Sequence, residues 1–126
     1  HKGRNNIILD DNIKIQSINV KHGTMKPCFG YIININGKTV GFSGDSSYCN
    51  AVDKIVEASD VSILDMSLKG DGDKSHMGFL DIKEICKKYP NKKIVATHMR
   101  NSTREVALDN PIKNLIIPAE NFEIKL

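Results

Sequence analysis

Four residues of the metal-binding or proton-transferring types stand where predicted strands end or in the loop before a predicted helix. His22 and His98 each stand where an apolar strand-like run stops, and Asp45 stands just beyond a third such run. His76 lies in a Gly/Asp-rich loop before a predicted helix. Strand ends are where an α/β scaffold presents side chains to a ligand. Two imidazoles and a carboxylate at one sheet edge suit Zn²⁺ or, less specifically, Mn²⁺ or Fe²⁺.

Each of these features taken singly has an ordinary structural alternative. One histidine at a strand end is more often a hydrogen-bonded structural residue than a ligand, and Gly44-Asp45 alone is most often a turn. The run 70–73 (Gly-Asp-Gly-Asp) looks like part of a calcium loop but lacks the downstream glutamate of an EF-hand, so we interpret it as a flexible loop. Cys28 has no neighbouring base that would make it a nucleophile.

The first half of the chain reads as strands. Apolar residues alternate at Ile13 and Ile15 and then, on the other parity, at Ile18 and Val20, which predicts one strand with a bulge near Ser17. Two more strands are predicted over residues 29–35 and 38–43. Asn36-Gly37 between them is a strong hairpin signal, because a type I′ turn needs positive φ at both central positions.

The second half alternates helices and strands. Strands are predicted over residues 61–64, 93–97, 115–117 and 122–124, and three helices are predicted between them. The first two helices show buried stripes, and Ser102-x-x-Glu105 is a capping-box pattern that opens the third. The stripe residues are Ala51, Val52, Ile55 and Val56 in the first helix and Ile82, Ile85, Cys86 and Tyr89 in the second, which Pro90 closes.

This order of elements predicts an α/β (α+β) fold, a mixed sheet with helices on one face. No repeat, low-complexity tract or Pro/Gly/Ser-rich linker divides the chain, so residues 1–126 read as a single domain. The other face of such a sheet needs a partner layer.

The polar segments, taken in order, resemble the second half of the metallo-β-lactamase superfamily, in particular the ribonuclease Z branch. The resemblance spans residues 13–126, and several motifs in order are more specific than any one alone. The motifs are His22-Gly23 followed by Phe29-Gly30-Tyr31, then Phe42-Ser43-Gly44-Asp45-Ser46, Ser75-His76-Met77 and Thr97-His98-Met99.

This resemblance implies an αββα sandwich of two similar halves with a dinuclear metal site at one edge. His22 would ligate the first metal, Asp45 would bridge both, and His98 would ligate the second. A water or hydroxide between two zinc ions would be the nucleophile. His76 matches the histidine that protonates the leaving group, a role that needs a group titrating near neutral pH.

The sequence departs from the family pattern in two places. The signature H-x-H-x-D-H, which supplies most of the metal ligands, is absent from this chain. Three ligands shared by two metals are too few for a stable site.

The tRNA-gripping insertion of ribonuclease Z is also absent, because only Asn36-Gly37 joins the two strands. A small phosphodiester or another ester is therefore the expected substrate, and nucleic acid is weakly supported.

Composition is that of an ordinary globular domain. The 126 residues are 40% hydrophobic and 26% charged with a net charge of +3, which permits phosphate contact without arguing for it. Cys28, Cys49 and Cys86 have no C-x-x-C spacing and fit reduced thiols in a cytoplasmic protein. No apolar run is long enough to span a membrane. The first residue is His1, so we expect further sequence upstream.

Three functional hypotheses follow. The first is a metal-dependent hydrolase, active when complete and inactive as this half. The second is a non-catalytic binding or assembly module that keeps the half-fold. The third is one chain of a split metallo-hydrolase. The expected partner is the N-terminal half or a second copy forming a homodimer.

Overall fold

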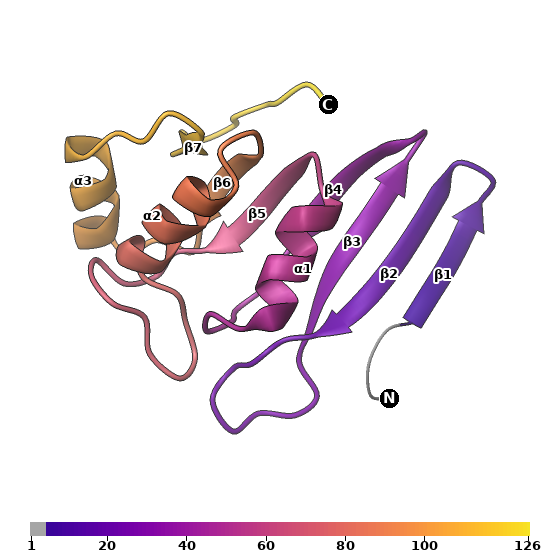
Figure 1. The fold of residues 1–126 in the computed structure, drawn as a ribbon, viewed down its shortest axis with the longest axis horizontal. Coiled ribbons are helices and arrows are strands. Elements are labelled where there is room, and N and C mark those ends of the chain that lie inside the picture. Colours follow the sequence, from indigo (N-terminus) through magenta and orange to yellow (C-terminus); the bar gives the residue numbers. More distant parts are fainter. Residues whose placement is uncertain (1–4) are drawn as a thin grey trace.

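The computed structural model describes residues 5–126, which form a seven-stranded sheet and three helices (Figure 1). The elements are β1 (Asn5–Asp10), β2 (Ile13–Asn19), β3 (Phe29–Ile35), β4 (Lys38–Phe42), α1 (Asn50–Ala58), β5 (Val61–Asp65), α2 (Phe79–Lys88), β6 (Lys93–Thr97), α3 (Asn101–Asp109) and β7 (Leu115–Ile116). No helix within these residues combines the length and apolarity needed to cross a membrane.

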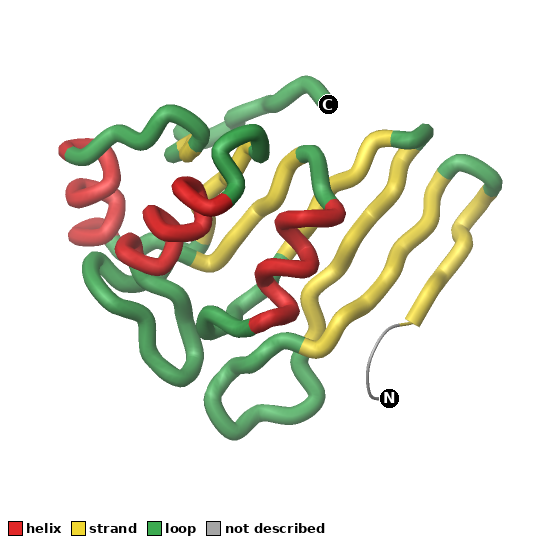
Figure 2. The backbone as a smooth tube through the Cα atoms, in the orientation of Figure 1, coloured by secondary structure: helices red, strands yellow, loops and turns green. Residues whose placement is uncertain are grey.

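The sheet is mixed, and its strands lie in sequence order from β1 to β7. β1 to β4 pair antiparallel, whereas β4 to β7 pair parallel. The three helices cover the same face of the sheet (Figures 1 and 2). The predicted fold class, a mixed sheet with helices on one face, is therefore confirmed.

The direction of the strands places four of their carboxyl ends at one edge of the sheet. β2 and β4 run the same way because both are antiparallel to β3, and β5 and β6 are parallel to β4. The segments that leave β2, β4, β5 and β6 therefore start side by side.

The core lies between the sheet and the helices, and the predicted helical stripes form it. All four stripe residues of α1 are buried, as are Ile82, Ile85 and Cys86 of α2, while Tyr89 caps α2 and is half-buried. Full burial of each such aliphatic side chain contributes about 1.5–3 kcal/mol. The apolar periodicity therefore fixes which side of each helix meets the sheet.

The predicted bulge near Ser17 is wrong. β2 pairs with β3 without interruption from Ile13 to Asn19, and the irregular register lies instead in β1, between Ile8 and Asp10. The apolar residues shift from odd to even positions along β2 because they lie on different faces of the sheet. Ile18 packs under α1, whereas Ile15 points to the opposite face. Both faces of this strand carry apolar side chains, so a straight strand explains the pattern.

Two further local predictions are wrong. Ser102 does not cap α3, because the helix begins at Asn101 and its N-cap residue, Arg100, makes no side-chain cap bond. The buried Thr103 hydroxyl donates instead to the Ser67 carbonyl oxygen at 2.7 Å, so tertiary contact sets where this helix begins. Residues 122–124 form no strand within the described chain.

β1 has no alternating pattern, because its apolar residues Ile7, Ile8 and Leu9 are consecutive. All three are exposed, at 51%, 66% and 62% of their surface. Pairing with β2, rather than an apolar periodicity of its own, makes this segment a strand.

The sheet face opposite the helices, called the open face below, is apolar. It carries the half-buried side chains of Ile13, Ile15, Tyr31, Ile33, Ile35 and Val40. The C-terminal residues 118–126 pass over its far end, where they form a mostly apolar groove with β4, β5 and β6. They leave Phe42 37% exposed, so the open face is only partly covered.

The contact between α1 and β4 requires a residue without a side chain. A Cβ atom on Gly41 would lie 2.5 Å from both Ile55 Cγ2 and Ser59 Oγ. We expect Gly41→Ala to lower the free energy of unfolding by about 1–3 kcal/mol, because overpacking must push α1 away from the sheet. The measurement is urea denaturation followed by circular dichroism. Gly70→Ala, at which a Cβ atom meets nothing within 4 Å, is the control, and equal stability of the two variants would contradict the expectation.

Candidate metal centre

The four residues singled out in the sequence lie together at the sheet edge where β2, β4, β5 and β6 end. His22 and Asp45 each follow a strand by three residues, and His98 follows β6 directly. The loop after β5 returns to this edge and carries His76 there. The shared strand direction therefore brings together residues that are up to 76 positions apart in the sequence.

The tightest group consists of Asp45, His76 and His98. One ligand atom from each lies within 4.8 Å of the others, and His98 Nε2 is 3.8 Å from Asp45 Oδ1. The His76 ring lies between two other imidazoles, with centroid distances of 5.3 Å to His98 and 4.9 Å to His22. His22 therefore borders this group through His76.

The orientation of His22 is fixed by a backbone carbonyl. Its Nδ1 lies 2.8 Å from the carbonyl oxygen of Ser75. Because a carbonyl oxygen only accepts, Nδ1 carries the proton and donates it. The lone pair of the neutral ring is then on Nε2, the atom that remains available to a metal ion.

His76 is oriented by a buried carboxylate. Its Nδ1 lies 2.7 Å from Asp65 Oδ2, and the Asp65 side chain has no exposed surface. The same carboxylate accepts the backbone N–H groups of Ser46 and Ser67, each at 3.0 Å, and the Ser67 hydroxyl. These four donors compensate the loss of hydration that burying a charge entails.

The motif analysis did not single out Asp65. It is the last residue of β5 and directly follows a buried apolar run, which is the same signal that drew attention to His98. An aspartate at a strand end is common, and none of the motifs that carry the family resemblance contains it. Its role becomes visible only when its hydrogen-bond partners from three segments are brought together.

The backbone turns sharply where β4 and β6 end. Gly44, just before Asp45, has φ +60°, a conformation that glycine adopts without steric cost. His98 itself has φ +60°, which for a residue with a Cβ costs about 1–3 kcal/mol and is typical of functional sites. Both turns lie at the candidate donors Asp45 and His98.

The candidate donors are accessible while their support is buried. The side chains of Asp45 and His98 are 47% and 54% exposed, and that of His76 is 20% exposed. A ligand can therefore reach the group from solvent, although Asp65 beneath it cannot be reached.

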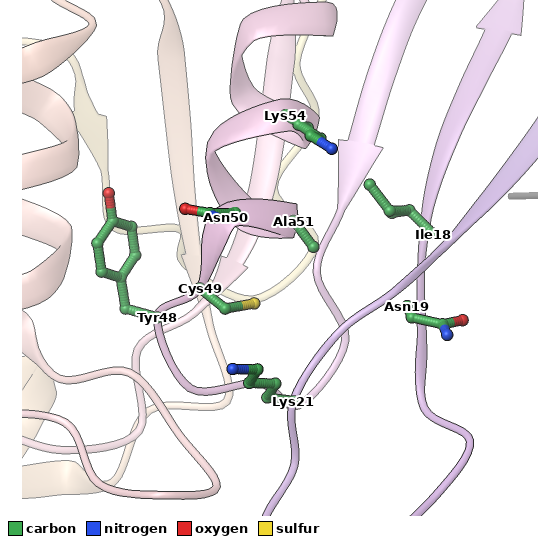
Figure 3. Close-up of a pocket in the computed structure, with 8 residues that line it drawn as sticks. All are labelled: Ile18, Asn19, Lys21, Tyr48, Cys49, Asn50, Ala51 and Lys54. Carbon is green, nitrogen blue, oxygen red and sulfur yellow. The ribbon is translucent and has the colours of Figure 1, made fainter. Parts of the chain in front are cut away.

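A separate cleft of about 520 Å³ opens at the start of α1 (Figure 3), and none of the four candidate residues lines it. Lys21, the neighbour of His22, lines it together with Lys54 from α1. Neither ammonium group forms an ion pair with residues 5–126. The cleft therefore offers unpaired positive charge close to the candidate donors.

The donor set fits a divalent transition metal. Imidazole nitrogen and carboxylate oxygen are the ligands that Zn²⁺ takes in catalytic sites, and Mn²⁺ and Fe²⁺ accept them as well. Two of the imidazoles have their second nitrogen held by an oxygen acceptor, the outer-shell arrangement typical of ligating histidines.

A mixed sheet with helices on one face and a His/Asp group at its strand ends defines a metallo-β-lactamase-type fold. Residues 3–99 match the Beta-lactamase superfamily domain. The chain therefore belongs to the β-lactamase superfamily. No curated protein sequence matched the chain.

Solved structures agree with this assignment. A "possible metal-dependent hydrolase" from Veillonella parvula DSM 2008 superimposes with a TM-score of 0.76 at 21% identity, covering 96% of this chain and 56% of that chain. An isothiocyanate hydrolase from Delia radicum gut bacteria gives 0.69 at 20% identity, covering 94% and 56%. A diphosphatase of the PhnP family gives 0.75 at 17% identity, covering 100% and 47%. The chain thus spans about half the length of the structures it matches.

Substitution of Asp65 tests the buried hydrogen bonds. In Asp65→Asn, one of the two carboxylate oxygens becomes an NH₂ group, so at least one buried donor loses its acceptor. We expect the free energy of unfolding to fall by about 1–3 kcal/mol, the cost of an unsatisfied buried donor. We also expect ¹⁵N NMR to show a changed His76 tautomer. The control is Asp71→Asn, at an exposed position in the same loop as His76. An unchanged His76 signal in Asp65→Asn would contradict the conclusion that Asp65 orients His76.

Proposed function

We propose that this chain is part of a metal-dependent hydrolase that cleaves a small phosphodiester or a related ester. The observation that carries this proposal is the convergence of the four candidate residues. Ligand atoms of Asp45, His76 and His98 lie within 4.8 Å of one another, and the His22 ring centroid lies 4.9 Å from that of His76. Membership of the β-lactamase superfamily supports it, as does the likeness to the "possible metal-dependent hydrolase" of Veillonella parvula.

In this proposal His22, Asp45 and His98 are metal ligands. Asp45 would bridge two zinc ions, with manganese or iron as alternatives, and His22 and His98 would each bind one of them, His22 through Nε2. Bound ions would supply Lewis-acid activation of water and of the ester. The chain's own groups would hold each imidazole in the tautomer that binds a metal ion. For His22, the Ser75 carbonyl oxygen does this by accepting Nδ1–H.

His76 is proposed as the general acid. Its Nε2 would donate a proton to the oxygen of the leaving group, while Nδ1–H stays bonded to Asp65 Oδ2. The buried Asp65 carboxylate, 2.7 Å away, holds the ring so that Nε2 is the nitrogen left to face the leaving group. A histidine is suited to this step because it changes protonation near neutral pH.

An anionic substrate fits the surroundings of the site. The unpaired ammonium groups of Lys21 and Lys54 line the neighbouring cleft, and the diphosphatase of the PhnP family shares the fold. The two-residue turn Asn36-Gly37 joins β3 and β4 without an insertion that could grip an RNA. We therefore favour a small phosphodiester over tRNA and leave the ribonuclease Z branch as a resemblance.

The proposed site needs further ligands. Three protein groups shared by two ions leave one or two for each, whereas a catalytic zinc ion usually has three. The solved structures are about twice the length of this chain, so we propose that an N-terminal half supplies the rest, in the same polypeptide or as a separate chain.

The open face points to the same partner. A contiguous apolar surface beyond a few hundred Å² is rare on a soluble monomer. We propose that this face packs against a second β layer, which would complete an αββα sandwich. The layer is the N-terminal half or, in its absence, a second copy of the chain.

Metal titration tests the proposed ligands. We expect calorimetry to show weak Zn²⁺ binding by the isolated chain, further weakened in Asp45→Ala and His98→Ala and unchanged in the control Asp71→Ala. We also expect no detectable hydrolysis of generic phosphodiesters. Tight stoichiometric zinc binding by the monomer would contradict this, as would turnover that Asp45→Ala abolishes.

Sedimentation velocity at micromolar concentration tests the partner layer. We expect the isolated chain to self-associate through the open face and Ile33→Lys to shift it towards monomer. Leu80→Lys, which adds the same charge at an exposed site on α2, should leave association unchanged. A wild-type chain that sediments as a clean monomer would argue against the sandwich.

A further inference from the structure

The loop that carries His76 is closed by one aspartate. Asp73 Oδ1 accepts the backbone N–H of Ser75 at 2.8 Å and that of His76 at 2.9 Å. The backbone N–H of Asp73 in turn donates to the His76 carbonyl oxygen at 2.9 Å. Three hydrogen bonds thus fix a four-residue turn, although the Asp73 side chain is exposed.

The same turn is bonded to the segment that carries His22. His22 Nδ1–H donates to the Ser75 carbonyl oxygen at 2.8 Å, and the Gly23 N–H donates to the Lys74 carbonyl oxygen at 2.8 Å. A Cβ atom on Gly23 would lie 2.9 Å from Ser75 Oγ, so the two segments are in close contact.

One peptide group connects these two sets of contacts. The Ser75 carbonyl that orients His22 and the His76 N–H that binds Asp73 belong to the same peptide unit. A trans peptide is planar, with its C=O and N–H pointing in opposite directions. Fixing the N–H on the Asp73 side therefore fixes the direction of the carbonyl on the His22 side.

We propose that Asp73 is a positioning residue that sets the orientation and tautomer of His22 through the Ser75–His76 peptide group. This inference rests on the proposed function in one respect, namely that His22 is a metal ligand. The two backbone hydrogen bonds hold the pKa of the Asp73 carboxyl below its usual range, with a further contribution from the nearby His76 and Arg100 charges. The carboxyl is therefore ionised at neutral pH and remains an acceptor for both N–H groups.

The test uses the metal-free chain, so its outcome does not depend on the proposed hydrolase activity. In the wild-type chain, hydrogen exchange should show protected amides at Ser75 and His76, and ¹⁵N NMR should show His22 protonated at Nδ1. In Asp73→Ala we expect both amides to lose protection and His22 to shift towards the Nε2–H tautomer. The His76 tautomer, held by Asp65, should stay unchanged.

Two matched variants separate positioning from charge. Asp73→Asn keeps an oxygen acceptor and should restore the wild-type signals, whereas Asp71→Ala removes one carboxylate from the same loop and should change nothing. Zn²⁺ affinity should fall about tenfold or more in Asp73→Ala, the usual effect of losing an outer-shell partner. An unchanged His22 tautomer in Asp73→Ala would overturn the proposal, as would unprotected amides in the wild-type chain or failure of Asp73→Asn to restore them.

Discussion

The carboxylate of Asp65 is bonded to three segments that meet at the edge of the sheet. It accepts the N–H of Ser46 from the loop after β4, both donors of Ser67 beyond β5, and Nδ1 of His76. Within residues 5–126 it is the one carboxylate, ammonium or guanidinium group with a buried side chain. Burial of a charge is unfavourable unless every lone pair finds a donor, so loss of any of these bonds destabilises the whole edge.

The accessible part of the site is built on this buried layer. The loop held through Ser46 also carries Asp45, and the loop held through Ser67 and His76 presents its turn to His22. The candidate metal-binding atoms can therefore be exposed and still have defined positions. This arrangement is typical of sites whose ligands are supported by a second layer of hydrogen bonds.

The two faces of the sheet have different roles. One is covered by the three helices and forms the core, whereas the open face carries apolar side chains that the described residues cover only in part. The matched structures are about twice the length of this chain, and the proposal of a second layer on that face rests partly on this difference. The apolar residues of β2 on both parities, taken for a sign of a bulge, belong to a straight strand with apolar side chains on both of its faces.

Most of the helices and strands, and all four candidate polar residues, could be predicted from the sequence alone, although β1 could not. Apolar periodicity located the two striped helices and the central strands, because burial of one face is a local property of the pattern. The order of His22, Asp45, His76 and His98 was sufficient to suggest a metallo-β-lactamase resemblance. The roles of these residues remain proposals.

Features that depend on contacts between residues far apart in the sequence could be seen only in the tertiary structure. β1 forms by pairing with β2, the first turn of α3 is held by the bond from Thr103 to Ser67, and Asp65 acquires its importance from donors on other segments. Hydrogen bonds between residues far apart in the chain leave no periodic trace in the sequence. The convergence of the four polar residues likewise follows from strand direction, which only the pairing of the strands fixes.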